Sequence, residues 1–166
     1  MKSGVPSGRS AAISVGWVPR TLHHAALCVR DLDASLRFYR DGIGLAVLMD
    51  HRFDGDWPAL FGAHSHTLRS VFLGDPASTD AGIVELVVFD GGVEDAALPG
   101  APTAGFFLVS FFVDVDATLA RLRELDLGGR ARRVEQPGPS GAVPMATVRD
   151  PDGVLVELIG AGPPGA

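Results

Sequence analysis

The sequence predicts an α+β domain built from two copies of a strand–helix–strand–strand–strand (βαβββ) unit. Two stretches of similar pattern, Val29–Gly44 and Val113–Gly129, each follow an apolar strand and contain a helix that begins near an aspartate and stops at glycine. Two later strands, IVELVVF from Ile83 and VLVELI from Val154, share the string Val-Glu-Leu and close their halves. Repeats of this length in the same relative order indicate duplicated supersecondary units that share a core.

The first unit opens with a strand over Leu22–Val29, which is mostly apolar and lacks proline and glycine. Asp31 and Asp33 are N-cap candidates for the helix that follows. Leu32, Leu36 and Tyr39 have the i, i+4, i+7 spacing of one apolar helix face. Gly42 and Gly44 mark the end of the helix.

The remaining elements follow from apolar runs separated by turn residues. The first unit continues with strands over Leu45–Met49, Leu68–Leu73 and Ile83–Phe89, and with a polar loop over His51–His66 that holds one helical turn around Pro58–Phe61. The second unit has strands over Phe106–Val113, Arg132–Glu135, Val143–Val148 and Val154–Ile159, a helix capped by Asp114 or Asp116, and a turn over Asp150–Gly153.

A single domain over residues 21–160 is therefore expected, with module one at 21–95 and module two at 104–160. Residues 1–20 are rich in Ser, Gly and Ala, show no periodicity and lack the apolar segment of a secretory signal. They predict a flexible arm, and residues 161–166 a short tail.

Composition excludes several classes of function. The formal charge of −6 argues against a sequence-independent nucleic-acid binder, and the longest apolar run, at 104–113, is about half of the roughly 20 residues that a membrane span needs. Cys28 is the single cysteine and lies in an apolar strand, which predicts a core residue in a reducing, cytoplasmic compartment. No nucleotide-binding fingerprint is present, so no nucleotide cofactor is expected. The positive mean hydropathy of +0.23 favours a homodimer.

Three strings carry a resemblance to a known family: LHHAALCVRDLDASLRFYRDGIGL, IVEL and VRDPDGVLVELI. With the repeat, they cover nearly all of residues 21–160, and the chain resembles the vicinal oxygen chelate superfamily. That superfamily includes glyoxalase I, methylmalonyl-CoA epimerase, extradiol dioxygenases, fosfomycin-resistance proteins and bleomycin-binding proteins. The resemblance implies that the two modules form one curled, mixed-sheet cup. It also implies a divalent metal in that cup, held by one side chain from the first and last strand of each module.

Carried over to this sequence, the resemblance implies His24, Glu85 and Glu157 as metal ligands. Imidazole and carboxylate suit divalent iron, manganese, nickel, cobalt or zinc. The fourth position falls on Leu108, or on Phe107 if a one-residue gap is allowed, and neither side chain binds a metal. The chain therefore departs from a typical glyoxalase I and from the ligand triad of the extradiol dioxygenases.

Two functions remain open at this point. The resemblance implies a metal-assisted isomerase, epimerase or lyase that acts on a small oxygenated carbonyl substrate, with Glu85 or Glu157 as the catalytic residue that moves a proton. The alternative is a metal-free binding or resistance protein for a small, antibiotic-type molecule, which the apolar first strand of module two favours. Substrate contacts are expected at Trp57, His64, His66, Phe106 and Leu108.

Overall fold

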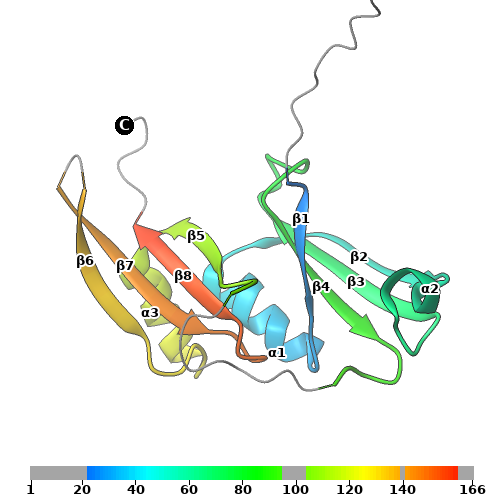
Figure 1. The fold of residues 1–166 in the computed structure, drawn as a ribbon. Coiled ribbons are helices and arrows are strands. Elements are labelled where there is room, and N and C mark those ends of the chain that lie inside the picture. Colours follow the sequence, from blue (N-terminus) through cyan, green and yellow to red (C-terminus); the bar gives the residue numbers. More distant parts are fainter. Residues whose placement is uncertain (1–21, 95–103, 139–140, 161–166) are drawn as a thin grey trace, which may run out of the picture.

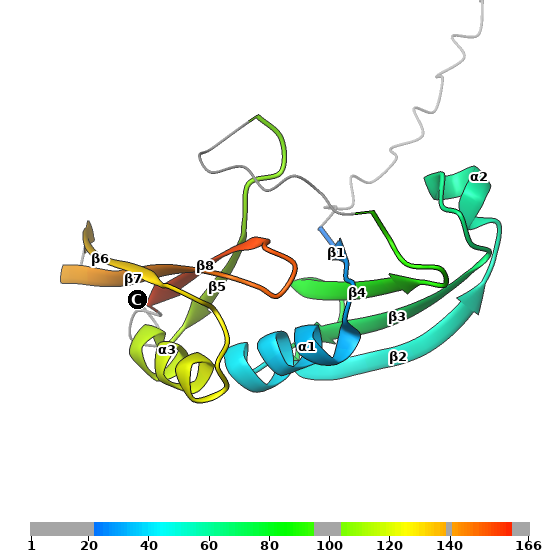
Figure 2. The ribbon, with the colours of Figure 1, turned by 90° about the horizontal axis from the view of Figure 1, so that it is seen from below.

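A computed structural model describes residues 22–94, 104–138 and 141–160. Two four-stranded sheets lie side by side, and the principal helices of both modules pack on the same side of them (Figures 1 and 2). The expected arm over residues 1–20 and the tail over 161–166 lie outside the described residues. No helix in the described ranges is long and apolar enough to cross a membrane.

Module one forms the sheet that we call sheet A, with strand order β1-β4-β3-β2. Strand β1 runs parallel to β4, and the other pairs are antiparallel. Its elements are β1 (His24–Cys28), α1 (Leu32–Leu36), the π-helical η1 (Arg37–Ile43), β2 (Ala46–Asp54), α2 (Trp57–Phe61), β3 (Thr67–Gly74) and β4 (Ile83–Phe89).

Module two repeats this arrangement in sheet B, whose strand order is β5-β8-β7-β6. Strand β5 runs parallel to β8, and the other two pairs are antiparallel. Its elements are β5 (Val109–Val113), α3 (Val115–Glu124), β6 (Arg132–Gly138), β7 (Gly141–Arg149) and β8 (Leu155–Gly160). The predicted pair of βαβββ modules is confirmed, because β4 and β8 occupy equivalent central positions.

Both modules cap their helices in the same way. The side chain of Asp31 accepts a hydrogen bond from the backbone N–H of Ala34 at 3.0 Å, and Asp114 does the same for Ala117 at 3.0 Å. Each aspartate satisfies a donor that the first turn leaves without a helical partner. The first helix ends at Gly44, whose φ of 102° is left-handed and therefore suits glycine.

The hydrophobic core lies between the helices and one face of each sheet. Strand residues on that face alternate with residues on the other face, as the period of two requires. The core joins both modules and consists of Leu27, Val29, Phe38, Tyr39, Ile43, Val71, Leu73, Val84, Leu86, Val115, Leu122, Ala146, Val148, Val156 and Leu158.

The two modules meet through their helices. A guanidinium nitrogen of Arg37 donates to the carbonyl of Leu125 at 2.9 Å, and Nε of Arg121 donates to the carbonyl of Gly42 at 3.1 Å. Helices α3 and η1 approach closely at Gly42, where a Cβ atom would lie 2.4 Å from Cδ2 of Leu122. Each module thus supplies a donor to carbonyls at the helix end of the other.

Several predicted boundaries differ from the structure, and two of the differences bear on the site. Strand β2 continues to Asp54, which pairs with Thr67, so His51 lies on a strand and not in the loop that we expected. The predicted helical turn in that loop is confirmed as α2. Strand β5 begins at Val109, three residues later than predicted, where its parallel pairing with β8 starts at the pair Val109 and Val156.

Candidate functional site

The site is built on the face of each sheet that points away from α1, η1 and α3, which we call the cup face. Along β1, the side chains of Leu27 and Val29 enter the core, so His24, Ala26 and Cys28 lie on the cup face. On β4, Val84 and Leu86 enter the core, so the intervening Glu85 also lies on the cup face. Strand alternation therefore brings His24 and Glu85 to the same side of sheet A.

His24 and Glu85 are in direct contact. Nε2 of His24 lies 3.2 Å from Oε2 of Glu85, with 37% of the histidine side chain and 15% of the glutamate side chain exposed. The other oxygen, Oε1, accepts a hydrogen bond of 2.5 Å from Oγ of the buried Ser70. Both carboxylate oxygens of Glu85 therefore have partners, which explains how the sheet tolerates this glutamate among apolar neighbours.

Sequence reasoning did not single out Ser70. The available signal was a small polar residue in a mostly apolar strand, LRSVFL. The buried serine fixes the orientation of the carboxylate that contacts His24.

His23 lies beside His24, although strict alternation along a strand would place the two side chains on opposite faces. The Nδ1 atoms of the two rings are 2.8 Å apart, and both rings pack near Phe72, with centroid distances of 6.0 and 5.3 Å. Strand alternation does not apply here because β1 begins at His24.

Glu157 belongs to the other sheet. Its Oε2 accepts a hydrogen bond of 2.8 Å from Oγ of Ser110 on β5. Among the described residues, no group of three or more His, Cys, Asp and Glu side chains is arranged to hold a metal ion. The structure therefore brings together His24 and Glu85, and the convergence of Glu157 with them, within one chain or across a dimer, stays a prediction.

Strand register identifies the position in module two that corresponds to His24. Ala26 pairs with Glu85, and Ser110 pairs with Glu157. His24 stands two residues before Ala26, and Leu108 stands two residues before Ser110. Leu108, and not Phe107, is thus the counterpart of His24, at a position where no metal ligand is available.

The remaining predicted contacts lie in two places. Near α2, the ring of Trp57 stacks on Phe61 with a centroid distance of 5.6 Å, His66 Nδ1 lies 3.1 Å from the carbonyl oxygen of Gly55, and His64 is exposed. At the start of module two, Phe106 is 68% exposed. These positions are accessible, and their expected contacts with a substrate stay predictions.

Cys28 is exposed on the cup face and is not the core residue that the apolar strand suggested. Partial burial raises the pKa of its thiol, and the negative charge of Glu85 raises it further. A raised pKa leaves less thiolate at neutral pH, so Cys28 is poorly suited to act as a nucleophile.

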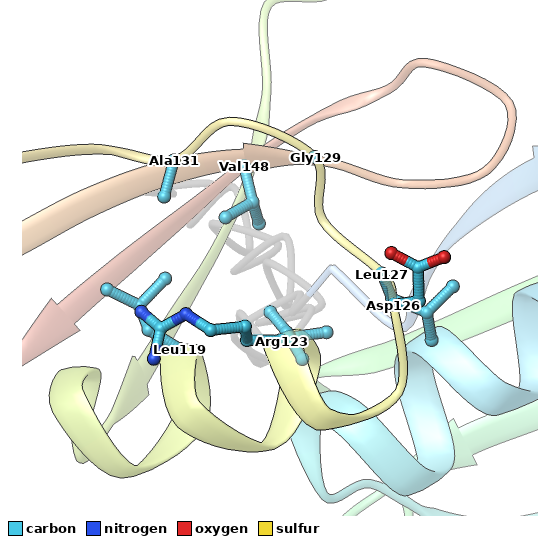
Figure 3. A pocket seen from close by; sticks show the side chains of 8 residues that line it. Leu119, Arg123, Asp126, Leu127, Gly129, Ala131 and Val148 are labelled. Atoms are coloured by element: carbon cyan, nitrogen blue, oxygen red, sulfur yellow. The ribbon is translucent and has the colours of Figure 1, made fainter.

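A pocket of about 340 Å³ lies on the opposite side of sheet B, between α3 and β7 (Figure 3). It contains none of the residues predicted for the site. The lining residues are Leu119, Leu122, Arg123, Asp126, Leu127, Gly129, Ala131 and Val148.

Comparison with known proteins places this geometry in context. A model of the "Glyoxalase/Bleomycin resistance protein/Dioxygenase superfamily" matches residues 21–158. The lactoylglutathione lyase-like protein terB of Aspergillus terreus is 38% identical, over 83% of this chain and 74% of its own length. A probable lactoylglutathione lyase of Synechocystis is 32% identical, over 83% of this chain and 93% of its own length.

Solved structures resemble the fold over most of this chain. A glyoxalase family protein from Bacillus cereus aligns with a TM-score of 0.67 at 23% identity, covering 90% of this chain and 98% of its own. The trypanothione-dependent glyoxalase I of Leishmania major aligns with a TM-score of 0.55 at 27% identity, covering 86% and 87%.

Proposed function

We propose, because the chain belongs to the Glyoxalase/Bleomycin resistance protein/Dioxygenase superfamily, that it is a metal-assisted lyase or isomerase acting on a small oxygenated carbonyl compound. The observation that carries the proposal is the contact between His24 and Glu85 on the cup face. The names of the relatives from Aspergillus terreus and Synechocystis support a lyase.

The His24–Glu85 pair suits a divalent cation. Nε2 of His24 and Oε2 of Glu85 lie 3.2 Å apart, close enough for both atoms to bind one ion through bonds of roughly 2 Å. Ser70 holds the second carboxylate oxygen, which favours binding through Oε2 alone. Glu157 would be the third ligand, from module two of the same chain or of a second copy.

The chemistry divides between the two glutamates. A divalent cation at this site would supply Lewis acidity to a substrate carbonyl. Glu85 is engaged at both oxygens, whereas Glu157 has one described hydrogen bond, from the exposed Ser110. Glu157 is therefore the better candidate to take a proton from the carbon beside that carbonyl and to return it to a neighbouring atom.

Metal analysis of protein purified without chelators tests the proposal. The parent chain should bind nickel, cobalt or zinc, and His24→Ala and Glu85→Gln should lose most of that affinity while staying folded. Asp90→Asn is the matched control, because Asp90 is an exposed carboxylate that pairs with Arg52. A parent chain that binds none of these ions would refute the proposal.

A metal-free binding protein is the second candidate. Leu108 takes the place of a ligand, and three phenylalanines of module two, Phe106, Phe107 and Phe112, are 51–77% exposed. Such side chains suit the sequestration of an apolar molecule. Ligand binding that is unchanged in His24→Ala and in the absence of metal would favour this function over the enzyme.

A further inference from the structure

The register of β2 adds a third strand to the cup face around Glu85. Ser70 on β3 donates a hydrogen bond to Glu85, so the side chain of Ser70 lies on the cup face. Residues of β2 that pair with Ser70 and with its alternate neighbours on β3 lie on the same face. The pairs are Met49 with Phe72, His51 with Ser70, and Phe53 with Leu68. A diagonal of polar groups therefore crosses sheet A from His51 through Ser70 and Glu85 to His24.

The rest of this face is apolar. Its side chains come from the three strands β2, β3 and β4, and several of them are buried or half-buried. They are Met49, Phe53, Leu68, Phe72, Ile83, Val87 and Phe89. A ligand over Glu85 would thus meet hydrocarbon on most sides.

The strand arginines of sheet A lie on the other face. Arg52 and Arg69 are cross-strand partners and alternate with the cup-face residues. Arg69 pairs with Asp50 at 2.6 Å, and Arg52 pairs with Asp90. The described strands of sheet A therefore present no lysine or arginine to a ligand on the cup face.

The cup-face arginines of the described strands belong to sheet B. Arg132 lies on the outer strand β6, where it pairs with Thr147. Arg149 lies on β7 and donates to the carbonyl of Gly153 at 2.5 Å. Both residues are on the sheet that carries Glu157, with Arg132 on its edge strand and Arg149 bound to a carbonyl, so the basic side chains of the described cup-face strands lie on sheet B and not on the sheet of the His24–Glu85 pair.

We propose, on the basis of the proposed function, that the substrate is an uncharged, largely apolar carbonyl compound rather than a glutathione conjugate, with His51 binding one of its oxygens. A glutathione conjugate carries two carboxylates, which proteins bind through arginine or lysine. The described cup face of sheet A offers instead the polar diagonal from His51 to His24, with hydrocarbon around it, in a chain whose net charge is −6. On sheet A the carboxylates of such a conjugate would lack a cationic partner, whereas an apolar ligand would bury its surface there.

His51 is an exposed polar residue on this face that lies outside the Ser70–Glu85–His24 contacts. Its ring packs edge-on against Phe53, with a centroid distance of 4.6 Å. Directly paired residues have Cβ atoms about 5 Å apart, so His51 stands next to Ser70. If His51 binds one oxygen of the substrate, the neighbouring carbonyl group of the substrate would lie over Glu85.

Two ligands with the same aromatic ring test the substrate class on the full chain: neutral 1-phenylpropane-1,2-dione and the doubly carboxylated S-benzylglutathione. The ring signals of His24 and His51 are followed by NMR during titration. The dione should shift both sets of signals. S-benzylglutathione should need a concentration at least about tenfold higher to produce the same shift, which corresponds to about 1.4 kcal/mol in binding free energy.

A pair of variants on β2 tests the role of His51. His51→Phe keeps an aromatic ring and should weaken dione binding about three- to tenfold, the range of one hydrogen bond. Arg52→Gln is the matched control on the opposite face and should leave binding unchanged. Equal binding of dione to His51→Phe and parent would overturn the role of His51.

Binding and turnover separate this inference from the proposed function. S-benzylglutathione that binds as tightly as the dione, or a dione that leaves the His24 and His51 signals unmoved, overturns the substrate class. Turnover of a glutathione hemithioacetal also overturns it while supporting a lyase. Dione binding at His51 without lyase or isomerase activity in added nickel or zinc supports the substrate class and counts against the proposed function.

Discussion

Tyr39 of module one donates its hydroxyl hydrogen to Oδ2 of Asp150 of module two at 2.8 Å, and both side chains are buried. The other oxygen of Asp150 accepts from the backbone N–H groups of Asp152 and Val154. The turn that links β7 to β8 is thereby fixed to the helix of the opposite module. Asp152 extends this contact through its ion pair with Arg30 at 2.7 Å.

Replacing Tyr39 by Phe should lower the free energy of unfolding by about 1–3 kcal/mol, because a buried carboxylate oxygen loses its donor. Urea unfolding followed by circular dichroism measures the change. A loss within error of zero would mean that water replaces the hydroxyl at Asp150.

Asp150 should also make stability depend on pH. Burial raises the pKa of its carboxyl, and hydrogen bonds from Tyr39 and Val154 oppose that rise. A group whose pKa is higher in the folded state stabilises the fold below its ordinary pKa and loses that contribution as pH rises through the raised value. On acidification from about pH 7 to about pH 4, the parent should therefore gain stability relative to Asp150→Asn. The free energies of unfolding of the parent and of Asp150→Asn are measured across that pH range. A parent that loses stability relative to Asp150→Asn on acidification would contradict the raised pKa.

Gly42 should be intolerant of a side chain. Gly42→Ala places Cβ against Leu122 and should reduce stability by about 1–3 kcal/mol, a usual range for overpacking. Leu122→Ala removes the clashing atoms, so the double variant should lose less stability than the sum of the single variants. Additive losses in thermal or urea unfolding would show that the helices simply move apart.

Leu108→His should increase affinity for nickel, cobalt or zinc, because it adds a nitrogen ligand at the counterpart of His24. Thermal unfolding with and without metal reports the gain, since binding to the folded state raises its stability. Phe107→His, one residue out of register, serves as the control. Equal metal-induced shifts in both variants would mean that Leu108 does not face the site.

A homodimer is the expected assembly. The chain combines a mean hydropathy of +0.23 with large exposed apolar side chains, among them Leu22 at 79% and Phe112 at 77%. An isologous two-fold contact would cover such surface on both copies. Sedimentation at micromolar concentration should show the dimer, and a purely monomeric species would refute it.

The sequence predicted best what depends on local pattern. The strand Ile83–Phe89 has the predicted bounds, and Asp31 and Asp114 act as the predicted caps. Each depends on residues within a few positions along the chain, namely an unbroken apolar run or an aspartate before a helical pattern.

What the sequence missed depends on pairing between distant residues. The polar stretch around His51 forms a strand because it pairs with β3, a tertiary effect that outweighs local composition. The contact of Ser70 with Glu85 likewise requires the register of β3 against β4. The π-helical turns of η1 have no local signature, although they place Gly42 against Leu122.

The reciprocal hydrogen bonds of Arg37 and Arg121 have a consequence for how the chain folds and how it arose. A module on its own would leave helix-end carbonyls without these donors and the shared core open to water. The two sheets should therefore unfold in one cooperative transition, although no described strand of one sheet pairs with a strand of the other. A half-length ancestor of this chain would have needed a second copy of itself to fold, and gene duplication would then have converted that obligatory partner into the other half of one polypeptide.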